Sequence, residues 1–382
     1  FNQKNDDYYY HLGLNAFSME QFEKSRKAFE RSLEIDDMDA EVKFELGRSL
    51  AKLEDYDGAA KSFRSAIRLK QDLQKAHFNL GLAYRNLKNL DGAISALSES
   101  VKLNDNDGEA YYHLGLTYYN LEKYEHAEKS FNSALLLEKG HYLSIYKLGM
   151  TYKKMGLLDE AIKQFSDAVT YNEADFELFT NFGLTYYDLG ESNSDRANYT
   201  NAVGQFANAI KDNPESKKAN YNQGLAYYRL GYSENSYFEN AVESFQKTID
   251  IDPSFLDGYF KLGLSYLKLG RYEEAVDKLK DVRQMDPNDA ASNYLIGYCN
   301  RKLEKQKDAM DAFLVSNSLD PLQESIKALL TWDNNPQNGN SYFHLGAVLV
   351  RSVGSEGAIE ALKQSIALDP SHQQSHYYLG IA

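Results

Sequence analysis

The chain has 382 residues, of which 43% are hydrophobic and 26% charged, so it has enough apolar surface to form a core and is not expected to be disordered. Its 56 acidic and 42 basic residues give a formal net charge of −14, which disfavours nucleic acid and anionic membrane surfaces as partners. The single cysteine, Cys299, excludes an internal disulfide and any zinc site built on two or more cysteines, and it leaves both a cytoplasmic and a periplasmic location open for this soluble chain.

A glycine that follows leucine or phenylalanine recurs every 34 residues in the first half of the chain, at Gly13, Gly47, Gly81, Gly115, Gly149 and Gly183. The series continues at Gly224, Gly263, Gly297, Gly346 and Gly380, where three of the steps exceed 34 residues by 7, 5 and 15. A fixed period of this length indicates a repeat architecture. The chain is therefore predicted to contain ten full repeats, the start of an eleventh, and three insertions.

The spacing within each repeat predicts two helices. In the fourth repeat, one face of the first helix carries Tyr111, Leu114, Gly115 and Tyr118, and one face of the second carries Ala127, Phe131 and Ala134. Lys123 lies in the short connection between the two helices. Because Gly115 and Ala127 are small, two antiparallel backbones can approach closely, with aromatic rings filling the space beside them.

The three insertions divide the predicted array. Repeats one to nine occupy residues 1–321, and inside them residues 190–201 and 231–240 are expected to lengthen the turns of repeats six and seven and to protrude side by side. These two stretches are interpreted either as solvated loops or as an accessory binding rim. Residues 322–338, which include the only tryptophan, Trp332, are predicted to form an extra helix and loop, followed by repeat ten and the start of repeat eleven at 339–382.

This pattern resembles the tetratricopeptide repeat, a 34-residue helix-turn-helix family, over essentially the whole chain. The resemblance implies an all-α fold, a right-handed superhelical solenoid of antiparallel helix pairs in which the first helix of each repeat lines a concave groove. It also implies a scaffold that binds a protein or peptide and does no chemistry itself.

No sequence motif of catalysis, phosphate binding or metal binding is found, so we expect no enzyme activity, no cofactor and no metal site. The acidic segment 104–109 resembles part of a calcium loop but is interpreted as a turn between repeats, because its flanking positions cannot ligate. His372 and His376 have a spacing that two metal ligands could share, and are interpreted as packing and loop residues. Asn198 begins a glycosylation sequon that matters only in a secretory pathway.

A second stripe on the first helices, offset by one residue from the core stripe, is expected to face the groove. Its first position is aromatic in nine of ten repeats, and four residues further on it is often leucine, as at Leu82, Leu116 and Leu264, with Met150 at the same place in repeat five. Packing between repeats and contact with a ligand both remain open as explanations. The candidate binding residues are Phe78, Asn79, Arg85, Tyr112, Tyr119, Tyr146, Asn181, Tyr187, Tyr221, Asn222, Tyr228 and Phe260.

The residues at these groove positions can be compared with those that two subclasses of the family use for binding. The co-chaperone type holds a C-terminal carboxylate through Lys and Asn residues, and here the Lys position is aromatic or Thr and the Asn position is never Asn. The type attached to a sugar-transferring enzyme has a ladder of groove asparagines, of which only Asn79, Asn181 and Asn222 are present. These three could each hydrogen-bond a peptide backbone.

The favoured hypothesis is a non-enzymatic scaffold that holds a segment of another protein in its aromatic and leucine-lined groove. The alternative is a repeat arm that self-associates, or that regulates a catalytic or membrane part of a larger protein outside this sequence. The alternative is motivated by a chain that begins at Phe1 and ends at Ala382 within a repeat, which leads us to expect a fragment. No membrane insertion is expected, because the apolar runs are far shorter than the ~20 residues that a spanning helix needs.

Overall fold

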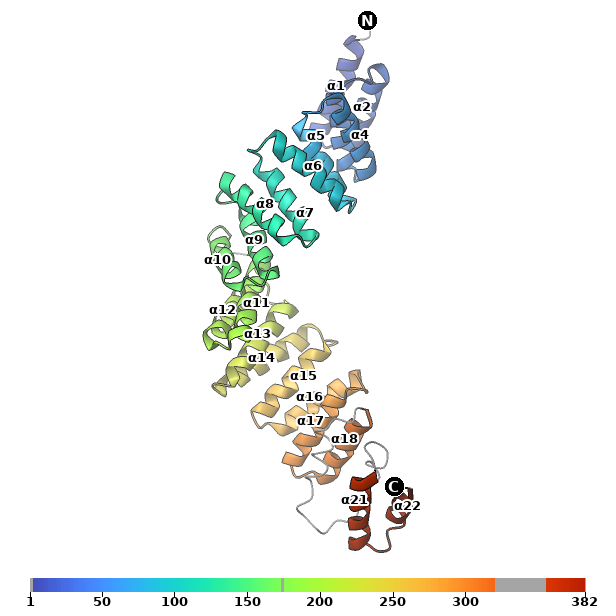
Figure 1. Cartoon of the computed structure of the whole chain (residues 1–382), viewed down its shortest axis with the longest axis vertical. Coiled ribbons are helices and arrows are strands. Elements are labelled where there is room, and N and C mark those ends of the chain that lie inside the picture. The colour runs from blue at the N-terminus through green and yellow to red at the C-terminus, as the bar shows by residue number, and fades with distance from the viewer. Residues whose placement is uncertain (1–2, 173–174, 320–354, 382) are drawn as a thin grey trace. The chain divides into compact units, whose positions relative to one another are not determined.

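The computed structural model describes residues 3–172, 175–319 and 355–381, which form 20 helices and no strand (Figure 1). The predicted all-α fold of antiparallel helix pairs is confirmed in these residues. The chain divides into two compact units, an N-terminal unit, Phe1–Thr185, and a C-terminal unit, Tyr186–Ala382, and the boundary lies inside helix α11.

In the N-terminal unit, each repeat contributes a first helix and a second helix. The helices are α1 (Gln3–Ser18), α2 (Phe22–Ile35), α3 (Ala40–Lys52), α4 (Tyr56–Leu69), α5 (Gln74–Asn86), α6 (Leu90–Leu103), α7 (Gly108–Asn120), α8 (Tyr124–Leu137), α9 (Tyr142–Lys154), α10 (Leu158–Val169) and the beginning of α11 (Phe176–Asn193). Each helix packs on the one before it, so the repeats from α1 to α9 stack in chain order.

The C-terminal unit continues the alternation of first and second helices. It contains the end of α11 and then α12 (Arg196–Asp212), α13 (Lys217–Gly231), α14 (Ser236–Ile251), α15 (Leu256–Lys268), α16 (Tyr272–Met285), α17 (Ala290–Lys302), α18 (Gln306–Leu319), α21 (Ser355–Leu368) and α22 (Gln373–Ile381). The predicted helix and loop at 322–338, with Trp332, and residues 339–354 of the tenth repeat lie outside the described residues.

The repeated glycine interlocks with a large side chain of the second helix, as predicted, and this side chain is a phenylalanine in most of the described pairs and a leucine at Leu97 and Leu279. A Cβ atom on Gly115 of α7 would lie only 2.7 Å from Cε1 of Phe131 on α8, and Phe131 is fully buried. The same close approach recurs between Gly47 and Phe63 and between Gly297 and Phe313. Because the ring occupies the volume that a side chain would need, this position of the first helix requires glycine.

The turns are short and are closed by side chains of the sequence itself. Within a repeat, one residue of the turn has a positive φ, as at Glu54 (62°) and Glu122 (58°), and glycine takes this place at Gly156 (77°). Between repeats, an acidic residue often caps the next helix: Asp107 Oδ1 accepts a hydrogen bond of 3.0 Å from the Ala110 N–H at the start of α7. Asp107 belongs to segment 104–109, so its interpretation as a turn between repeats is confirmed.

The two insertions at 190–201 and 231–240 form helix rather than the lengthened turns that were expected. Helix α11 continues to Asn193 and α12 begins at Arg196, while α13 continues to Gly231 and α14 begins at Ser236. The added turns have a small core of their own, because Gly190 faces the Tyr199 ring and Gly231 faces the Phe238 ring. The inserted aromatics thus extend the glycine-ring interlock beyond the regular repeat, and burying them favours helix over a solvated loop.

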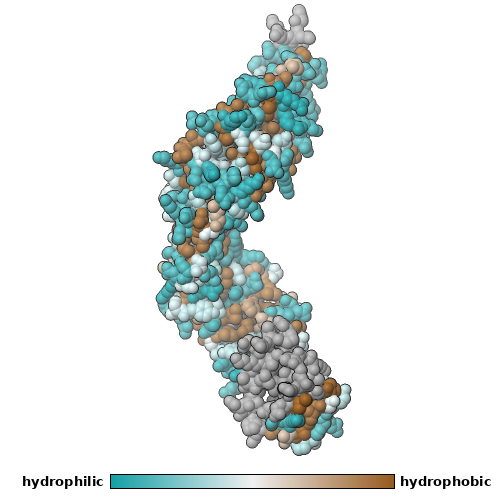
Figure 2. Space-filling view, viewed as in Figure 1, coloured by the Kyte–Doolittle hydropathy of each residue, from teal (hydrophilic) through white to brown (hydrophobic). Residues whose placement is uncertain are grey.

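Among the described residues, no helix has the length and apolar character needed to cross a membrane. In the view of Figure 2, apolar residues are scattered among hydrophilic ones over the described helices.

Candidate interaction face on the first helices

The first helices of the N-terminal unit form one continuous face. Successive first helices from α1 to α9 contact one another, whereas the second helices make fewer contacts of this kind among the described residues. The first helices are therefore closer to one another than the second helices are. We call this surface the first-helix face and use the same name for the exposed side of first helices in the C-terminal unit.

Most aromatic residues at the first groove position pack within their own repeat. The ring of Tyr112 lies 6.1 Å from that of Phe131, and the ring of Tyr146 lies 6.0 Å from that of Phe165. Tyr112 and Tyr146 are only 7% and 6% exposed and belong to the core. Tyr221 packs in the same way on Phe245 of its own repeat, at 5.7 Å. Tyr112 and Tyr221 also contact rings of the next repeat, His141 and Phe255, each at 5.0 Å, so packing inside a repeat and between repeats both explain why this position is aromatic.

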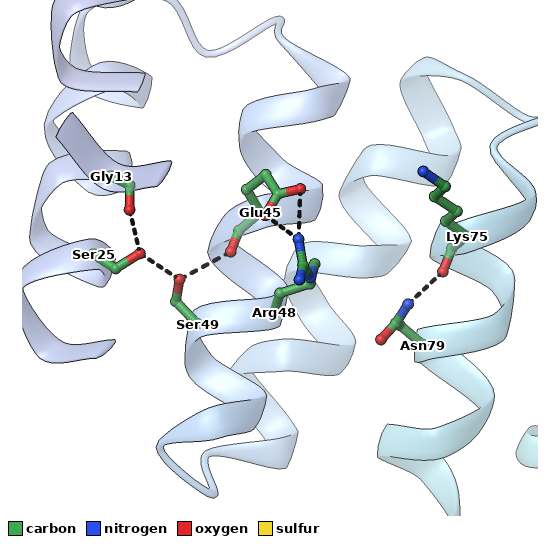
Figure 3. A network of polar contacts seen from close by, with 7 residues as sticks. All are labelled: Gly13, Ser25, Glu45, Arg48, Ser49, Lys75 and Asn79. Carbon is green, nitrogen blue, oxygen red and sulfur yellow. Dashed lines mark hydrogen bonds and ion pairs between the residues drawn. The ribbon is translucent and has the colours of Figure 1, made fainter. Parts of the chain in front are cut away.

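The three candidate asparagines direct their amide groups to their own helices. Asn79 Nδ2 donates to the Lys75 carbonyl oxygen at 2.8 Å (Figure 3), and Asn222 Nδ2 donates to that of Lys218 at 2.7 Å. Asn181 Nδ2 donates to the Glu177 carbonyl oxygen and also to the Tyr146 hydroxyl, at 2.9 and 2.7 Å. Each asparagine therefore keeps its side-chain oxygen as the atom that can accept a bond from a partner.

A polar cluster on α5 and α7 surrounds Arg85. Its Nη1 lies 2.6 Å from Nδ1 of His113, and the other ring nitrogen of His113 lies 3.6 Å from a carboxylate oxygen of Glu109. Burial, with the nearby charge of Arg85, lowers the pKa of His113 to about 4. The ring is neutral at pH 7, so Arg85 donates and Nδ1 accepts. The sequence pointed to Arg85 but missed His113, the residue that orients it.

The half-buried His113 makes stability depend on pH. A folded pKa of about 4 lies below the ordinary value of 6.5, so between these values the unfolded chain binds the proton more tightly and stability falls as the pH drops. Between pH 7.5 and pH 5, the free energy of unfolding measured by chemical denaturation should fall by about 1–2 kcal/mol more in the native chain than in the His113→Gln variant. The side-chain oxygen of glutamine can still accept a hydrogen bond from Arg85, so the variant keeps this contact. An identical pH dependence of the two proteins would contradict this account.

In the C-terminal unit, the candidate residues meet the lengthened helices. Tyr187 of α11 lies 5.6 Å from Tyr199, and Tyr228 of α13 lies 5.3 Å from Phe238. Phe260 of α15 packs against the buried cluster of α16 and α17. The half-buried rings of Tyr187, Tyr228 and Phe260 thus support the fold and also face outward in part.

Two ion pairs join the lengthened helices of repeats six and seven. Arg229 of α13 lies 2.5 Å from Glu191 of α11, and Arg196 of α12 lies 3.2 Å from Glu234 in the turn between α13 and α14. The prediction that the two insertions lie side by side is therefore confirmed. The sequence analysis missed these pairing residues. A signal was present, because Gly190 and Gly231 each follow a repeat glycine by seven residues, which is the same face of a helix.

The motifs set aside in the sequence have local partners. The ring of His372 contacts the Ser375 hydroxyl at 2.8 Å, and Nε2 of His376 lies 2.9 Å from the Pro370 carbonyl oxygen. Asn198 of the sequon is buried, so the folded chain does not present it. Within residues 3–172, 175–319 and 355–381, no three His, Cys, Asp or Glu side chains are grouped so that they could hold a metal ion.

Family models described as tetratricopeptide repeats match most of the chain, at residues 10–73, 45–107 and 187–254 for one model and 108–141 and 143–175 for another. A model described as subunit 3 of the anaphase-promoting complex matches residues 234–315. No curated protein sequence matches the chain.

Several solved structures are similar to this chain. The C-terminal part of a repeat-containing protein from Cytophaga hutchinsonii is 20% identical, covers 66% of this chain and 99% of its own, and has a TM-score of 0.56. YrrB, whose title describes an unusual peptide-binding site, is 22% identical over 51% of this chain and 96% of its own, with a TM-score of 0.45. MamA is 24% identical over 45% and 93%, with a TM-score of 0.43. The first of these supports the solenoid fold of helix pairs.

Proposed function

The chain belongs to the tetratricopeptide repeat family, and on that basis we propose that it is a non-enzymatic scaffold that binds a segment of another protein on its first-helix face. Repeats of this family build protein-interaction scaffolds. The net charge of −14 supports a polypeptide rather than a nucleic acid as the partner.

A row of half-exposed apolar side chains on the N-terminal unit carries this proposal. Phe78 and Leu82 lie one turn apart on α5, and Tyr119 and Met150 continue the row on α7 and α9. All four side chains are half-buried. Leu82 is half-buried and lies outside the buried cluster around Phe63 and its packed neighbours. Tyr119 also packs against the buried cluster around Phe131, so Leu82 carries most of the argument. A half-exposed apolar side chain next to polar groups is typical of an interface.

The first-helix face can be tested with random dodecapeptides displayed on phage and selected against the full chain. Peptides that are enriched should then be synthesised and their affinity measured by fluorescence anisotropy. Leu82→Ser should weaken their binding at least tenfold, because it removes an apolar contact at the centre of the row. Leu136→Ser is the matched control: this leucine is 80% exposed on the second helix α8, and its loss should leave the affinity unchanged.

A further variant separates the two units. If Leu264→Ser on α15 weakens binding and Leu82→Ser does not, the site lies on the first-helix face of the C-terminal unit. If both variants bind like the native chain, or if no peptide is enriched, a peptide site on the first helices is excluded.

Self-association remains a second candidate function because of one surface of the N-terminal unit. Helices α1 and α2 enclose an open groove of about 600 Å³, lined in part by Leu12, Ala16 and Met19, and two of these side chains, Leu12 and Met19, are exposed. A helix of a second copy could cover this groove. Light scattering on the same preparations gives the mass, and a concentration-dependent dimer without peptide binding would favour this alternative.

A further inference from the structure

Six arginines, Arg26, Arg31, Arg48, Arg196, Arg229 and Arg271, each form an ion pair with a glutamate of this chain. In Figure 3, Arg48 donates to both carboxylate oxygens of the buried Glu45, at 3.0 and 2.8 Å. Arg85 lies on α5, the first helix of the next repeat, and its surroundings differ from those of Arg48. No carboxylate of the described residues pairs with it, and its hydrogen-bond partner is the neutral ring of His113.

The guanidinium of Arg85 has also lost part of its hydration. It is half-buried, and burial lowers its pKa, the direction expected for a cation that gives up water without gaining a negative charge. Its Nε is buried and makes no hydrogen bond with the described residues. Such a group remains charged at neutral pH, so the site keeps an uncompensated positive charge.

His113 holds this charge in place without cancelling it. Its Nδ1 accepts from Arg85 and its Nε2 faces Glu109, so the ring separates that exposed carboxylate from the guanidinium. The Phe78 ring lies 5.7 Å from the His113 ring. On α5, Phe78, Leu82 and Arg85 follow one another at spacings of four and three residues, which places two apolar contacts and one cation along a single helix face.

We propose that Arg85, oriented by His113, binds an aspartate or glutamate side chain of the protein segment that occupies the first-helix face of the N-terminal unit. This inference rests on the proposed function. The carboxylate would supply the missing negative charge and would accept from the guanidinium, and such charge-assisted pairs are among the stronger hydrogen bonds in proteins. The apolar residues of the same segment would lie on Leu82 and Phe78. The site thus selects a segment in which an acidic residue is near apolar ones.

The test uses the enriched dodecapeptides and the full chain. Peptides that depend on Leu82 should share one acidic position, and replacing that residue by its amide in a synthetic peptide should weaken binding to the native chain at least tenfold. The Arg85→Gln variant should bind the acidic peptide and its amide form equally. Arg85→Glu, used in a second selection, should enrich Lys or Arg at the same position.

The controls separate this inference from the proposed function. Arg68→Gln, an exposed arginine on the second helix α4, should keep the full preference for the acidic peptide. Arg85→Lys keeps the positive charge and should retain part of the preference for the acidic peptide over its amide form. A retained preference would show that substitution at this position does not simply unfold the chain. Peptides that depend on Leu82 but show no acidic preference, or that depend on Leu264 instead, would overturn the role of Arg85 and leave the scaffold intact. If no peptide is enriched, both proposals fail.

Discussion

Phe238→Ala is expected to lower the free energy of unfolding by roughly 3–5 kcal/mol, the loss typical of a buried phenylalanine. Phe238 is only 3% exposed and lies 5.3 Å from the ring of Tyr228. It also fills the space over Gly231, where a Cβ atom would lie 2.5 Å from its ring. Chemical denaturation and the far-ultraviolet circular dichroism of the variant would measure the loss.

The result decides what residues 231–240 do. Tyr232→Ala is the matched control in the same segment, because this tyrosine is 60% exposed, and it should change stability by less than about 1 kcal/mol. If Phe238→Ala were as mild as this control, with no loss of helix signal, the segment would behave as the solvated loop that the sequence suggested. A large loss confined to Phe238→Ala supports a packed extension of α13 and α14.

Gly115→Ala is expected to destabilise the N-terminal unit by about 1–3 kcal/mol, although alanine favours a helix by up to about 1 kcal/mol over glycine. The new Cβ would lie 2.7 Å from Phe131, whose ring is fully buried and has no free space beside it in the folded packing. Either the ring leaves its position or α7 and α8 separate. Because repeat arrays often unfold in parts, hydrogen exchange of the amides in α7 and α8 should accompany denaturation.

Gly204→Ala provides the control for this experiment. Gly204 also lies inside a helix, α12, but a Cβ there would have no atom within 4 Å. Helix propensity then acts alone and should stabilise the chain by roughly 0.5–1 kcal/mol. Opposite signs for the two substitutions would show that contact with Phe131 decides the result. A gain in stability from both would refute the interlock.

Local spacing predicted the fold of this protein. The 34-residue period, the helical spacing around Gly115 and the acidic turn at 104–109 each depend on residues near one another in the chain, and all three predictions are confirmed. The insertions were misjudged for a related reason. Both stretches contain Ser, Asn, Tyr and Gly, a composition that favours turns, whereas Gly190 and Gly231 continue the helix face of the repeat glycines.

The candidate site could be predicted only in part. The stripe of residues that face away from the core follows from helix geometry, and it includes Arg85 and Leu82. Tyr112 and Tyr146 are in the same stripe, yet the structure buries both against a phenylalanine of the second helix. A spacing rule assigns the direction of a side chain but not how much of it a neighbouring helix covers.

The sequence by itself determined the repeat, the two helices of each repeat and the position that must be glycine, because these depend on periodicity and on steric contact that recurs in each repeat. Only the tertiary structure decided which charges are paired. Arg48 has Glu45 on its own helix, whereas Arg85 meets His113, 28 residues away on the next first helix, and no carboxylate of the described residues. Such pairing depends on the distances between side chains on different helices, and the period of the sequence does not determine these distances.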